Sequence, residues 1–454
     1  MNFSNISNNN NYYDPNNIGS VFYQPFTVSF DPNVKFIDYS MDGAFSGQSY
    51  LYRVYNIPNT IKFMSGAFNG CYNFNQSIKL PSDLLNMVDT FRDCYSFNQN
   101  IKIPNNVNDL RGAFRGCYSF NQNIKLPNNI INLYNTFAYC DNFNQNIKLL
   151  DNIINMNSTF YGCQSFNQNI KLPNNLIDMD YTFYNCSNFN QPIEIPNNVM
   201  YMNHTFASCS FFNQPIKIPD NVIDMDYIFY RCYNFNQPIQ IPNNVSSLNS
   251  SFESSDFNQP IDFSSISWAL DNTFRYCKNF NQSIYIPNNI YSMENTFAYC
   301  YNFNSNVILP EKITSYYGLY STFQNCRAFN QNVQLPNFGA YYMQDTFSGC
   351  YNLNQNIFIP NHINRLNYTF ENCYNMSNLT IGNEDVYYFK NMVAGIKNRI
   401  NIYIRRFSLT NSYFWNRGNY YNNGLIGKTF SWTLDTPNSC YYNTYYNIYI
   451  YYTL

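Results

Sequence analysis

Few residues in this sequence carry a charge. Only 11% of the 454 residues are Asp, Glu, Lys or Arg, and the formal net charge is −2. A protein that holds nucleic acid through its overall charge needs an excess of Lys and Arg to displace counterions from phosphates. The composition therefore argues against a nucleic-acid partner. Aromatic residues make up 20% of the chain, so apolar material is plentiful and a disordered acidic tail does not fit.

Several targeting and ligand signals are also missing. The first residues, MNFSNISNNNNYYDPNN, have neither the basic start nor the apolar core of a secretory signal, and no apolar run approaches the ~18 residues of a membrane span. We therefore expect no membrane insertion, and export by another route, such as release inside a virus particle. Histidine occurs only as His204 and His362, so we expect no metal site and no cofactor.

Repetition dominates the sequence. The string Phe-Asn-Gln recurs at a step of 23 residues from Phe74 to Phe235, and the same position continues with small slips to Leu353. Roughly residues 41–383 are repeat, in about thirteen units. A unit of this size cannot bury an apolar face alone, so neighbouring units must stack and share one core. The sequence therefore predicts a solenoid.

Residues 120–142 show what each position in a unit does. Ile124 and Leu126 alternate with polar residues, which is typical of a short strand with one buried face. Pro127 ends this strand because it has no N–H to donate, and a turn follows. Apolar residues then recur at spacings of three and four, which favours a helical or 3₁₀ turn. These residues are Ile130, Leu133 and Phe137.

Two further columns repeat with the unit. The cysteines are predicted to be buried free thiols, because equivalent side chains in a stack point in parallel and small Ser254 and Ser255 stand where the column lapses. Disulfides are the alternative, since the Cα atoms of adjacent coils lie within bonding range. The asparagines that follow each Phe are predicted to form an internal ladder that satisfies turn backbone groups. They include Asn75, Asn98, Asn121 and Asn144.

The unit resembles the BspA-like leucine-rich repeats, which combine an Ile-x-Ile-Pro strand, further apolar residues and a closing Phe-x-x-Cys. Cys277–Cys300, CKNFNQSIYIPNNIYSMENTFAYC, contains all three, with Phe where the family prefers Leu. The sequence is also similar to FNIP and Phe-Asn-Gln repeats. The resemblance implies a leucine-rich-repeat-like solenoid with one short parallel β-strand plus a turn or short helical arc per 23-residue coil. It also implies surface adhesins or interaction proteins without shared catalytic residues.

Solenoids generally bind ligands on the exposed face of their sheet. The outward residue between the two strand aliphatics is mostly Lys in the first half of the repeats, and neutral or apolar in the last part. This lysine column is the candidate ligand-binding site, for an acidic glycan or an acidic protein face. A tolerated solvent residue copied by gene duplication is the alternative. The column comprises Lys79, Lys102, Lys125, Lys148, Lys171 and Lys217.

The two ends lack the repeat. Residues 1–40 are predicted to be an N-terminal arm and capping or anchoring segment, with a strand in Val21–Phe30. Residues 41–383 form the solenoid. Residues 384–454 are predicted to form a C-terminal β-rich cap or oligomerisation domain, with a helix in Asp385–Asn398 and strands in INIYIRRFSL, KTFSWTL and YNIYIYYTL. The last strand would aggregate as an open edge, so we expect it to be paired, either within the cap or in a homo-oligomer.

Catalysis is not expected. Glu194 and Asp262 lie three coils apart, about 14 Å by strand spacing, which is too far for a cooperating carboxylate pair. The leading hypothesis is a non-enzymatic virion structural or fibre protein of a phage, whose solenoid binds a receptor or decorates the particle. Its partners would be a host surface protein or glycan, or other virion proteins. The alternative is a bacterial or protist adhesin of the same repeat family at the cell surface.

Overall fold

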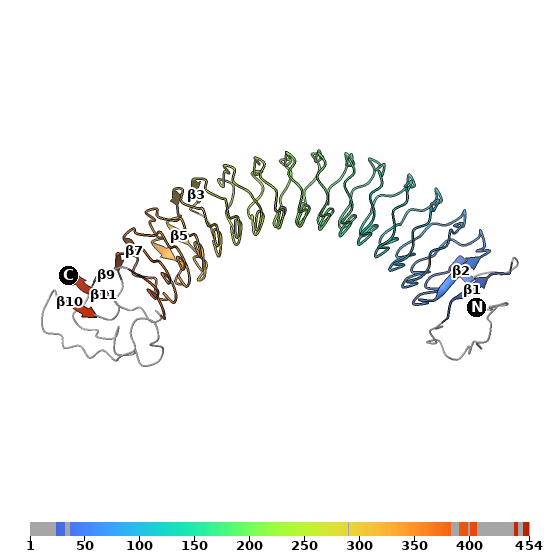
Figure 1. Cartoon of the computed structure of the whole chain (residues 1–454). Coiled ribbons are helices and arrows are strands. Elements are labelled where there is room, and N and C mark those ends of the chain that lie inside the picture. The colour runs from blue at the N-terminus through green and yellow to red at the C-terminus, as the bar shows by residue number, and fades with distance from the viewer. Residues whose placement is uncertain are drawn as a thin grey trace. The chain divides into compact units, whose positions relative to one another are not determined.

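The structure is a computed structural model that describes residues 24–31, 37–288, 290–382, 390–397, 400–405, 440–443 and 448–453. The chain divides into two compact units, Met1–Val222 and Ile223–Leu454. Both units consist of stacked coils (Figure 1), and the chain is a parallel β-solenoid of about 16 turns with coils of ~23 residues. The predicted leucine-rich-repeat-like solenoid is therefore confirmed, and the C-terminal β-rich cap stays a prediction.

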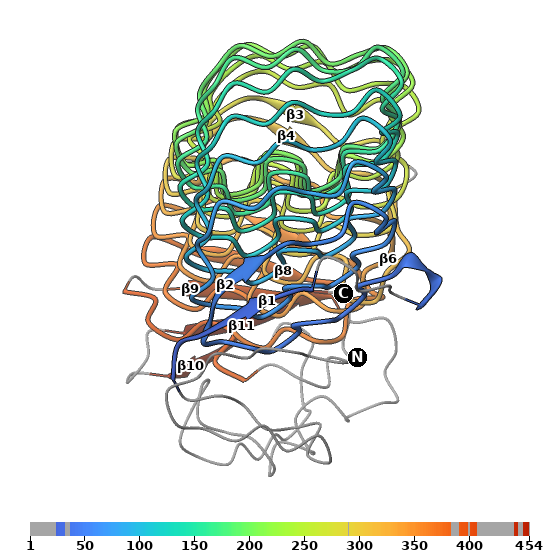
Figure 2. The same cartoon turned by 90° about the vertical axis from the view of Figure 1, so that its right-hand side faces the viewer.

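Regular secondary structure is sparse in the first unit. Strand β1 (Phe26–Ser29) pairs in parallel with β2 (Leu51–Tyr55), and the two lie side by side in Figure 2. The short 3₁₀ helix η1 (Ile37–Tyr39) comes between them in sequence. No helix in the described ranges has the length and hydrophobicity of a membrane span. The predicted strand in Val21–Phe30 is confirmed for β1, and residues 21–23 lie outside the described residues.

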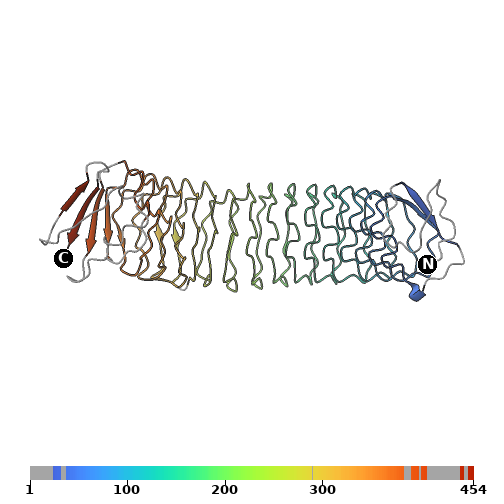
Figure 3. The ribbon, with the colours of Figure 1, turned by 90° about the horizontal axis from the view of Figure 1, so that it is seen from below.

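The second unit contains the remaining strands. Two parallel pairs come first, β3 (Ile284–Tyr285) with β4 (Val307–Ile308) and β5 (Lys312–Ile313) with β6 (Phe338–Gly339). A five-stranded sheet follows, drawn as orange to red arrows in Figure 3. Its order is β10 (Cys440–Asn443), β11 (Ile448–Thr453), β9 (Ile400–Arg405), β8 (Asn378–Ile381) and β7 (Ile357–Ile359).

The C-terminal strand predictions can be followed in this sheet. Strands β9 and β11 confirm the first and third predicted runs, and KTFSWTL lies outside the described residues. Strand β11 pairs in parallel with β9 and antiparallel with β10, so the aggregation-prone run is covered within the chain. Residues 390–395 of the predicted helix form turns instead, and residues 385–389 and 398 lie outside the described residues.

The coil repeat continues into this sheet. Thr380 of β8 lies opposite Tyr403 of β9, which is again 23 residues further along the chain (403 − 380). The regular stacking therefore extends past residue 383. The predicted domain boundaries and the predicted homo-oligomer stay predictions.

The strand side of each coil shows the predicted alternation. Ile124 and Leu126 are 6% and 4% exposed, whereas Lys125 between them is exposed. Among the described residues, paired ladders at this position occur in later coils, as β3–β4 and β7–β8. In the coils that follow the β1–β2 pair and precede β3, most backbone bonds between coils lie in the arc that closes each coil, where isolated parallel bridges such as Asn86↔Asp109 also occur.

Backbone hydrogen bonds in the arc follow a strict alternation. The N–H groups of Asp89, Phe91 and Asp93 donate to carbonyl oxygens of the next coil, at 2.9, 2.9 and 2.7 Å. The intervening N–H groups, those of residues 90, 92 and 94, donate to the carbonyl three residues earlier, at 3.0–3.1 Å. Each of these buried or half-buried donors is therefore satisfied without a helix.

Left-handed residues shape the arc. In successive coils, Gly112 and Gly116 have φ of 63° and 72°, and Asn135 and Tyr139 have φ of 56° and 60°. A left-handed residue at every fourth position is incompatible with a helix, so the arc is a series of turns. Of the two predicted forms, turn or short helical arc, the structure has the turn. Gly and Asn suit these positions because they reach positive φ at low cost.

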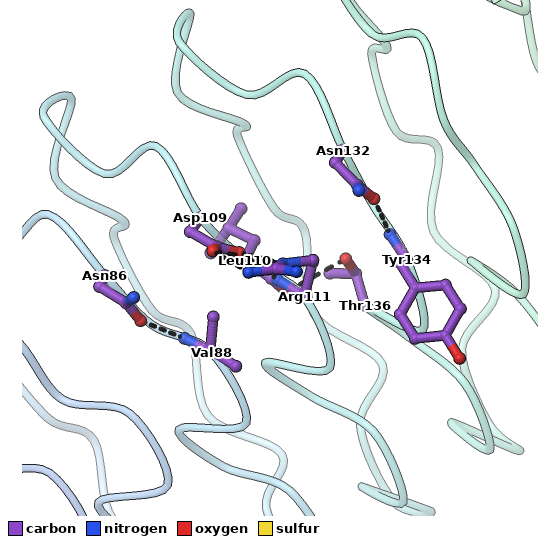
Figure 4. A network of polar contacts seen from close by, with 8 residues as sticks. All are labelled: Asn86, Val88, Asp109, Leu110, Arg111, Asn132, Tyr134 and Thr136. Atoms are coloured by element: carbon purple, nitrogen blue, oxygen red, sulfur yellow. Dashed lines mark hydrogen bonds and ion pairs between the residues drawn. The ribbon is translucent and has the colours of Figure 1, made fainter. Parts of the chain in front are cut away.

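Polar side chains form hydrogen bonds with backbone groups at the start of the arcs (Figure 4). Asn132 Oδ1 accepts a hydrogen bond from the N–H of Tyr134 at 2.8 Å, and Asn86 Oδ1 makes the same bond to Val88. Thr136, which is fully buried, donates its hydroxyl to the carbonyl of Leu110 in the previous coil at 3.2 Å. The buried hydroxyl is therefore paired, and it ties neighbouring coils together.

Two columns of phenylalanine fill the core. Phe91 stacks on Phe114 of the next coil with ring centroids 5.8 Å apart, and Phe97 stacks on Phe120 at 6.0 Å. The two columns touch each other, since the Phe91 and Phe97 centroids are 4.6 Å apart. All four rings are fully buried. Burial of one such side chain contributes roughly 1.5–3 kcal/mol, so these columns are the main apolar support of the stack.

The predicted free thiols are confirmed for the described part of the chain. Thirteen cysteines there form no disulfide and are buried. The thiols donate to backbone carbonyls of the previous coil, as in Cys117 Sγ to Phe91 O at 3.0 Å and Cys140 Sγ to Phe114 O at 3.1 Å. Where the column lapses, Ser255 occupies the same place and its hydroxyl donates to Phe252 O at 2.7 Å. A small side chain with one weak donor is what this position requires.

The asparagine ladder is also present. Asn121 Oδ1 accepts the backbone N–H of Asn144 and the Nε2 of Gln145 in the next coil, both at 2.9 Å. The same pair of bonds joins Asn98 to the coil of Asn121. This geometry explains why Asn and Gln occur together after the core Phe: the Asn oxygen accepts from both residues of the following coil.

Removing one rung of this ladder should destabilise the protein. Asn121→Ala leaves a half-buried amide without its acceptor, so we expect a loss of about 1–3 kcal/mol in the free energy of unfolding. Asn121→Asp keeps the Oδ1 acceptor and should stay close to wild type. Urea denaturation followed by circular dichroism measures both variants. Equal losses in the two would contradict a role for the acceptor oxygen.

The thiol column predicts a loss of stability in alkali. Burial raises the pKa of Cys71 and Cys277 from the ordinary 9.0 to about 12, and it also raises the pKa of other thiols of the column, such as Cys117 and Cys163. Above pH ~9 the unfolded chain loses protons that the folded chain retains. The thiol contribution to stability is therefore complete below that pH and falls as pH rises through the folded values.

We expect the thermal midpoint to fall steeply between about pH 9 and pH 12. Tyr and Lys also titrate in this range, so the variant Cys117→Ala/Cys140→Ala/Cys163→Ala provides the comparison. Its midpoint should be lower at pH 7 because cavities form, but it should fall less with pH. A pH dependence identical to that of wild type would refute the assignment to thiols.

Candidate binding face

The lysine column lies on the solvent side of the first unit. Each of the six side chains is exposed and stands between two residues that point into the core, as Lys102 does between Ile101 and Ile103. The buried neighbours anchor the backbone on both sides, so each lysine is held outward by the period-two geometry of an extended segment. All six predicted residues therefore share one face of one unit.

The register between lysines is set by the asparagine ladder. Lys125 follows Asn121 by four residues, and Asn121 is bonded to Asn98 of the preceding coil and to Asn144 of the next. Consecutive lysines from Lys79 to Lys171 thus stand one coil apart, roughly 5 Å along the stack. Ion pairs among the described residues use arginine as the cation, and none involves a lysine of this column.

The column has a defined end. Glu194, also exposed, replaces lysine in the coil after Lys171, and Lys217 stands alone in the following coil. At the same point the exposed asparagine two residues before each lysine gives way to Pro192 and Pro215. The continuous basic stripe is therefore the five coils from Lys79 to Lys171.

The equivalent column of the second unit is apolar at three positions and polar at Gln240, Asp262 and Gln334, which are also exposed. Tyr285, Ile308 and Phe358 are 59%, 51% and 45% exposed. Pairing of β3 with β4 places Tyr285 directly beside Ile308. Sequence reasoning anticipated this change from basic to neutral or apolar residues, and the structure places both kinds of residue on the strand side of their coils.

Sequence reasoning missed a second exposed apolar column at the start of the arc. In the first unit it contains Ile131, Ile154 and Ile177, which are 52%, 42% and 37% exposed. The N–H of Ile154 donates to Ile131 O at 3.0 Å, so these residues are direct neighbours. In the second unit Trp268 and Tyr291 stack at 4.7 Å between centroids. The available signal was two consecutive apolar residues, as in Ile130–Ile131, where one face is buried and the next residue must point outward.

Several acidic side chains with raised pKa values lie in the arcs, where their contacts are with the arcs' own groups. Burial raises the pKa of Asp271 and Glu294, and the N–H of Glu294 donates to Asp271 Oδ1 at 2.7 Å. Burial also raises the pKa of Glu253, whose carboxylate lies 3.6 Å from Arg275. Within the described ranges no three His, Cys, Asp or Glu side chains gather as a metal site would require.

Comparison with known proteins places the chain in a family. A family model described as Mycoplasma protein of unknown function, DUF285, matches residues 39–148, 104–194, 126–216 and 173–268. A model described as BspA type Leucine rich repeat region (6 copies) matches residues 270–402. The chain belongs to the DUF285 family, and its residues 270–402 are similar to the BspA-type leucine-rich repeats. The resemblance predicted from the repeat unit is therefore confirmed.

Solved structures of similar fold include other leucine-rich repeat proteins. A leucine-rich repeat protein from Bacteroides ovatus superposes with a TM-score of 0.53 at 21% identity, covering 85% of this chain and 89% of that chain. A leucine-rich cell surface protein from Faecalibacterium prausnitzii gives a TM-score of 0.43 at 18% identity, covering 63% and 91%. The first of these likenesses supports the fold of the BspA-like solenoid. A search of the curated proteins finds no match.

Proposed function

We propose that this BspA-like solenoid is a non-enzymatic interaction protein on a cell surface, which adheres to its partner through the exposed columns of its coils. The observation that carries the proposal is the division of each coil into a sealed interior and a repeated, solvent-facing row. In the first unit that row is mostly lysine, for which the described residues contain no ion pair, and in the second it includes the exposed Tyr285, Ile308 and Phe358 beside polar residues. Regular exposed rows on a rigid stack are what solenoids use for recognition.

Non-enzymatic binding also agrees with the chemistry of the buried groups. The thiols, hydroxyls and carboxylates of the described coils donate to or accept from backbone groups of their own stack, as Cys117, Thr136 and Asp271 do. Nucleophiles in such positions are shielded from a substrate. One of the two matching family models describes a leucine rich repeat region.

The cell-surface role was the second of the two functions predicted from sequence. The first, a phage virion fibre, gains no support from the family models or from the similar structures, whose descriptions concern cellular repeat proteins. We therefore put forward the adhesin reading, with a host surface protein or glycan as partner. Oligomerisation through the C-terminal region is not needed for it, because β11 is already paired on both edges within the chain.

Labelling of intact cells tests this proposal. Antibodies raised against the purified chain should bind unpermeabilised cells of the producing organism, and brief protease treatment of those cells should remove the signal. An antibody against a cytoplasmic protein serves as the control for intact membranes. Deletion of the chain should lower adhesion of the cells to host-cell monolayers several-fold. Labelling only after permeabilisation would refute the cell-surface role.

A further inference from the structure

We infer that the basic stripe from Lys79 to Lys171 binds a linear acidic polysaccharide carrying about one carboxylate per sugar residue. The inference rests on the proposed function and names the chemistry of its partner. It is argued from the charge of the stripe, from the side chains beside it and from the spacing of the lysines.

The stripe is a row of like charges that the chain itself does not neutralise. Five consecutive coils contribute one exposed lysine each, and no described ion pair involves any of them. The exposed carboxylates of the adjoining turns are those of Asp83, which accepts the hydroxyl of Ser82 at 3.2 Å, and Asp151, which accepts the N–H of Asn174 at 3.0 Å. Neighbouring ammonium groups lie within the Debye length of about 8 Å at physiological salt, so they repel one another. A polyanion laid along the stack relieves this repulsion.

Side chains beside the lysines favour a carbohydrate. The residues two positions before each lysine point to the same side, because the segment is extended. They are exposed and small or amidic. Amides both donate to and accept from hydroxyl groups, which a sugar chain offers in number. These residues are Ser77, Asn100, Asn123, Asn146 and Asn169.

The same side chains disfavour a nucleic acid and an acidic protein as the partner. Single-stranded nucleic acid is held by aromatic platforms between basic residues, and neither the lysine column nor the amide column contains an aromatic side chain in these coils. Protein interfaces depend on aromatic and other apolar anchors at their centre, which this stripe also lacks. An acidic protein face and a nucleic acid are therefore the competing outcomes of the test.

The spacing of the lysines selects the charge density of the ligand. One lysine per coil is one positive charge per roughly 5 Å along the stack. Duplex DNA carries one charge per ~1.7 Å of its axis, which is about three times denser. A chain with one carboxylate per sugar residue is sparser and leaves its hydroxyls free for the amide column. Glu194 ends the continuous stripe, so the site accommodates a short stretch of the polymer.

Binding of the full-length chain to immobilised polygalacturonate tests the inference. For about five charge contacts, the logarithm of affinity should fall with the logarithm of salt concentration with a slope of about −3 to −4. The variant Lys102→Gln/Lys125→Gln/Lys148→Gln should bind at least tenfold more weakly, with a slope smaller by about 2. The corresponding Lys→Arg triple should retain binding, since it keeps the charge.

A matched control removes the same charge elsewhere. Lys278→Gln/Lys312→Gln/Lys397→Gln alters three exposed lysines of the second unit that lie outside the strand column, and its affinity should stay within twofold of wild type. Equal losses in both Gln triples would overturn the inference in favour of overall charge. So would absence of binding to polygalacturonate, or equal or tighter binding to poly-L-glutamate, single-stranded oligothymidylate or heparin. The urea midpoint of the column triple should equal that of wild type because its side chains are exposed, and the control triple should lose only the contact of Lys397 with the Tyr374 ring, 4.3 Å from Nζ to the ring centroid.

The inference and the proposed function fail separately. If the column triple still supports adhesion of cells while polygalacturonate does not bind the wild-type chain, the ligand class is wrong and the adhesin role stands. If polygalacturonate binds through the column but antibodies label only permeabilised cells, the ligand class stands and the cell-surface role is wrong.

Discussion

The hydrogen bond from every second arc N–H to the next coil is the interaction on which the rest of the structure depends. It holds successive coils in one register, as Phe91 to Ala113 shows at 2.9 Å. Once coils are in register, every side-chain position becomes a column. The phenylalanine stacks, the thiols, the threonine hydroxyls and the exposed lysines all follow from this constraint, because like residues then meet like residues. Recognition by rows of identical side chains is therefore a consequence of backbone pairing.

Side-chain ladders keep this register through changes in coil length. The coil between Asn236 and Asn258 has 22 residues and the coil between Asn304 and Asn330 has 26, yet the same Asn-to-amide bond forms in both, at 2.8 Å. The additional residues of the longer coil are displaced outward, where Tyr316 and Tyr317 are 62% and 53% exposed. Insertions thus add surface features while the core columns continue, which is how a repeat protein can vary its binding face without losing its fold.

Much of the fold could be predicted because the same residue pattern recurs in every repeat unit, so each structural inference is supported by many copies. Alternation around Lys125, the buried thiols and the Asn121 ladder all follow from residue type and period, and the structure contains each of them.

The arc could not be derived in the same way. Apolar spacings of three and four around Ile130 suit a helix or a series of turns equally well, and only the left-handed residues separate them. The residue type of Asn135 indicates a left-handed conformation, because Asn is common at positive φ. Tyr139 gives no such indication, because aromatic residues are rarely found at positive φ. The exposed Ile131 column was missed for a related reason, since hydrophobicity alone does not reveal which of two adjacent apolar residues faces water.

The central claim is that one fixed register places the lysines in a continuous row on the first unit. Cross-linking of the native protein with a short amine-reactive reagent, followed by mass spectrometry, tests it most directly. The account predicts links between lysines of adjacent coils, Lys79–Lys102, Lys102–Lys125, Lys125–Lys148 and Lys148–Lys171, all of which disappear in denaturant. Links that skip coils, such as Lys79–Lys171, as the dominant products, or absence of the adjacent links from the native protein, would contradict it.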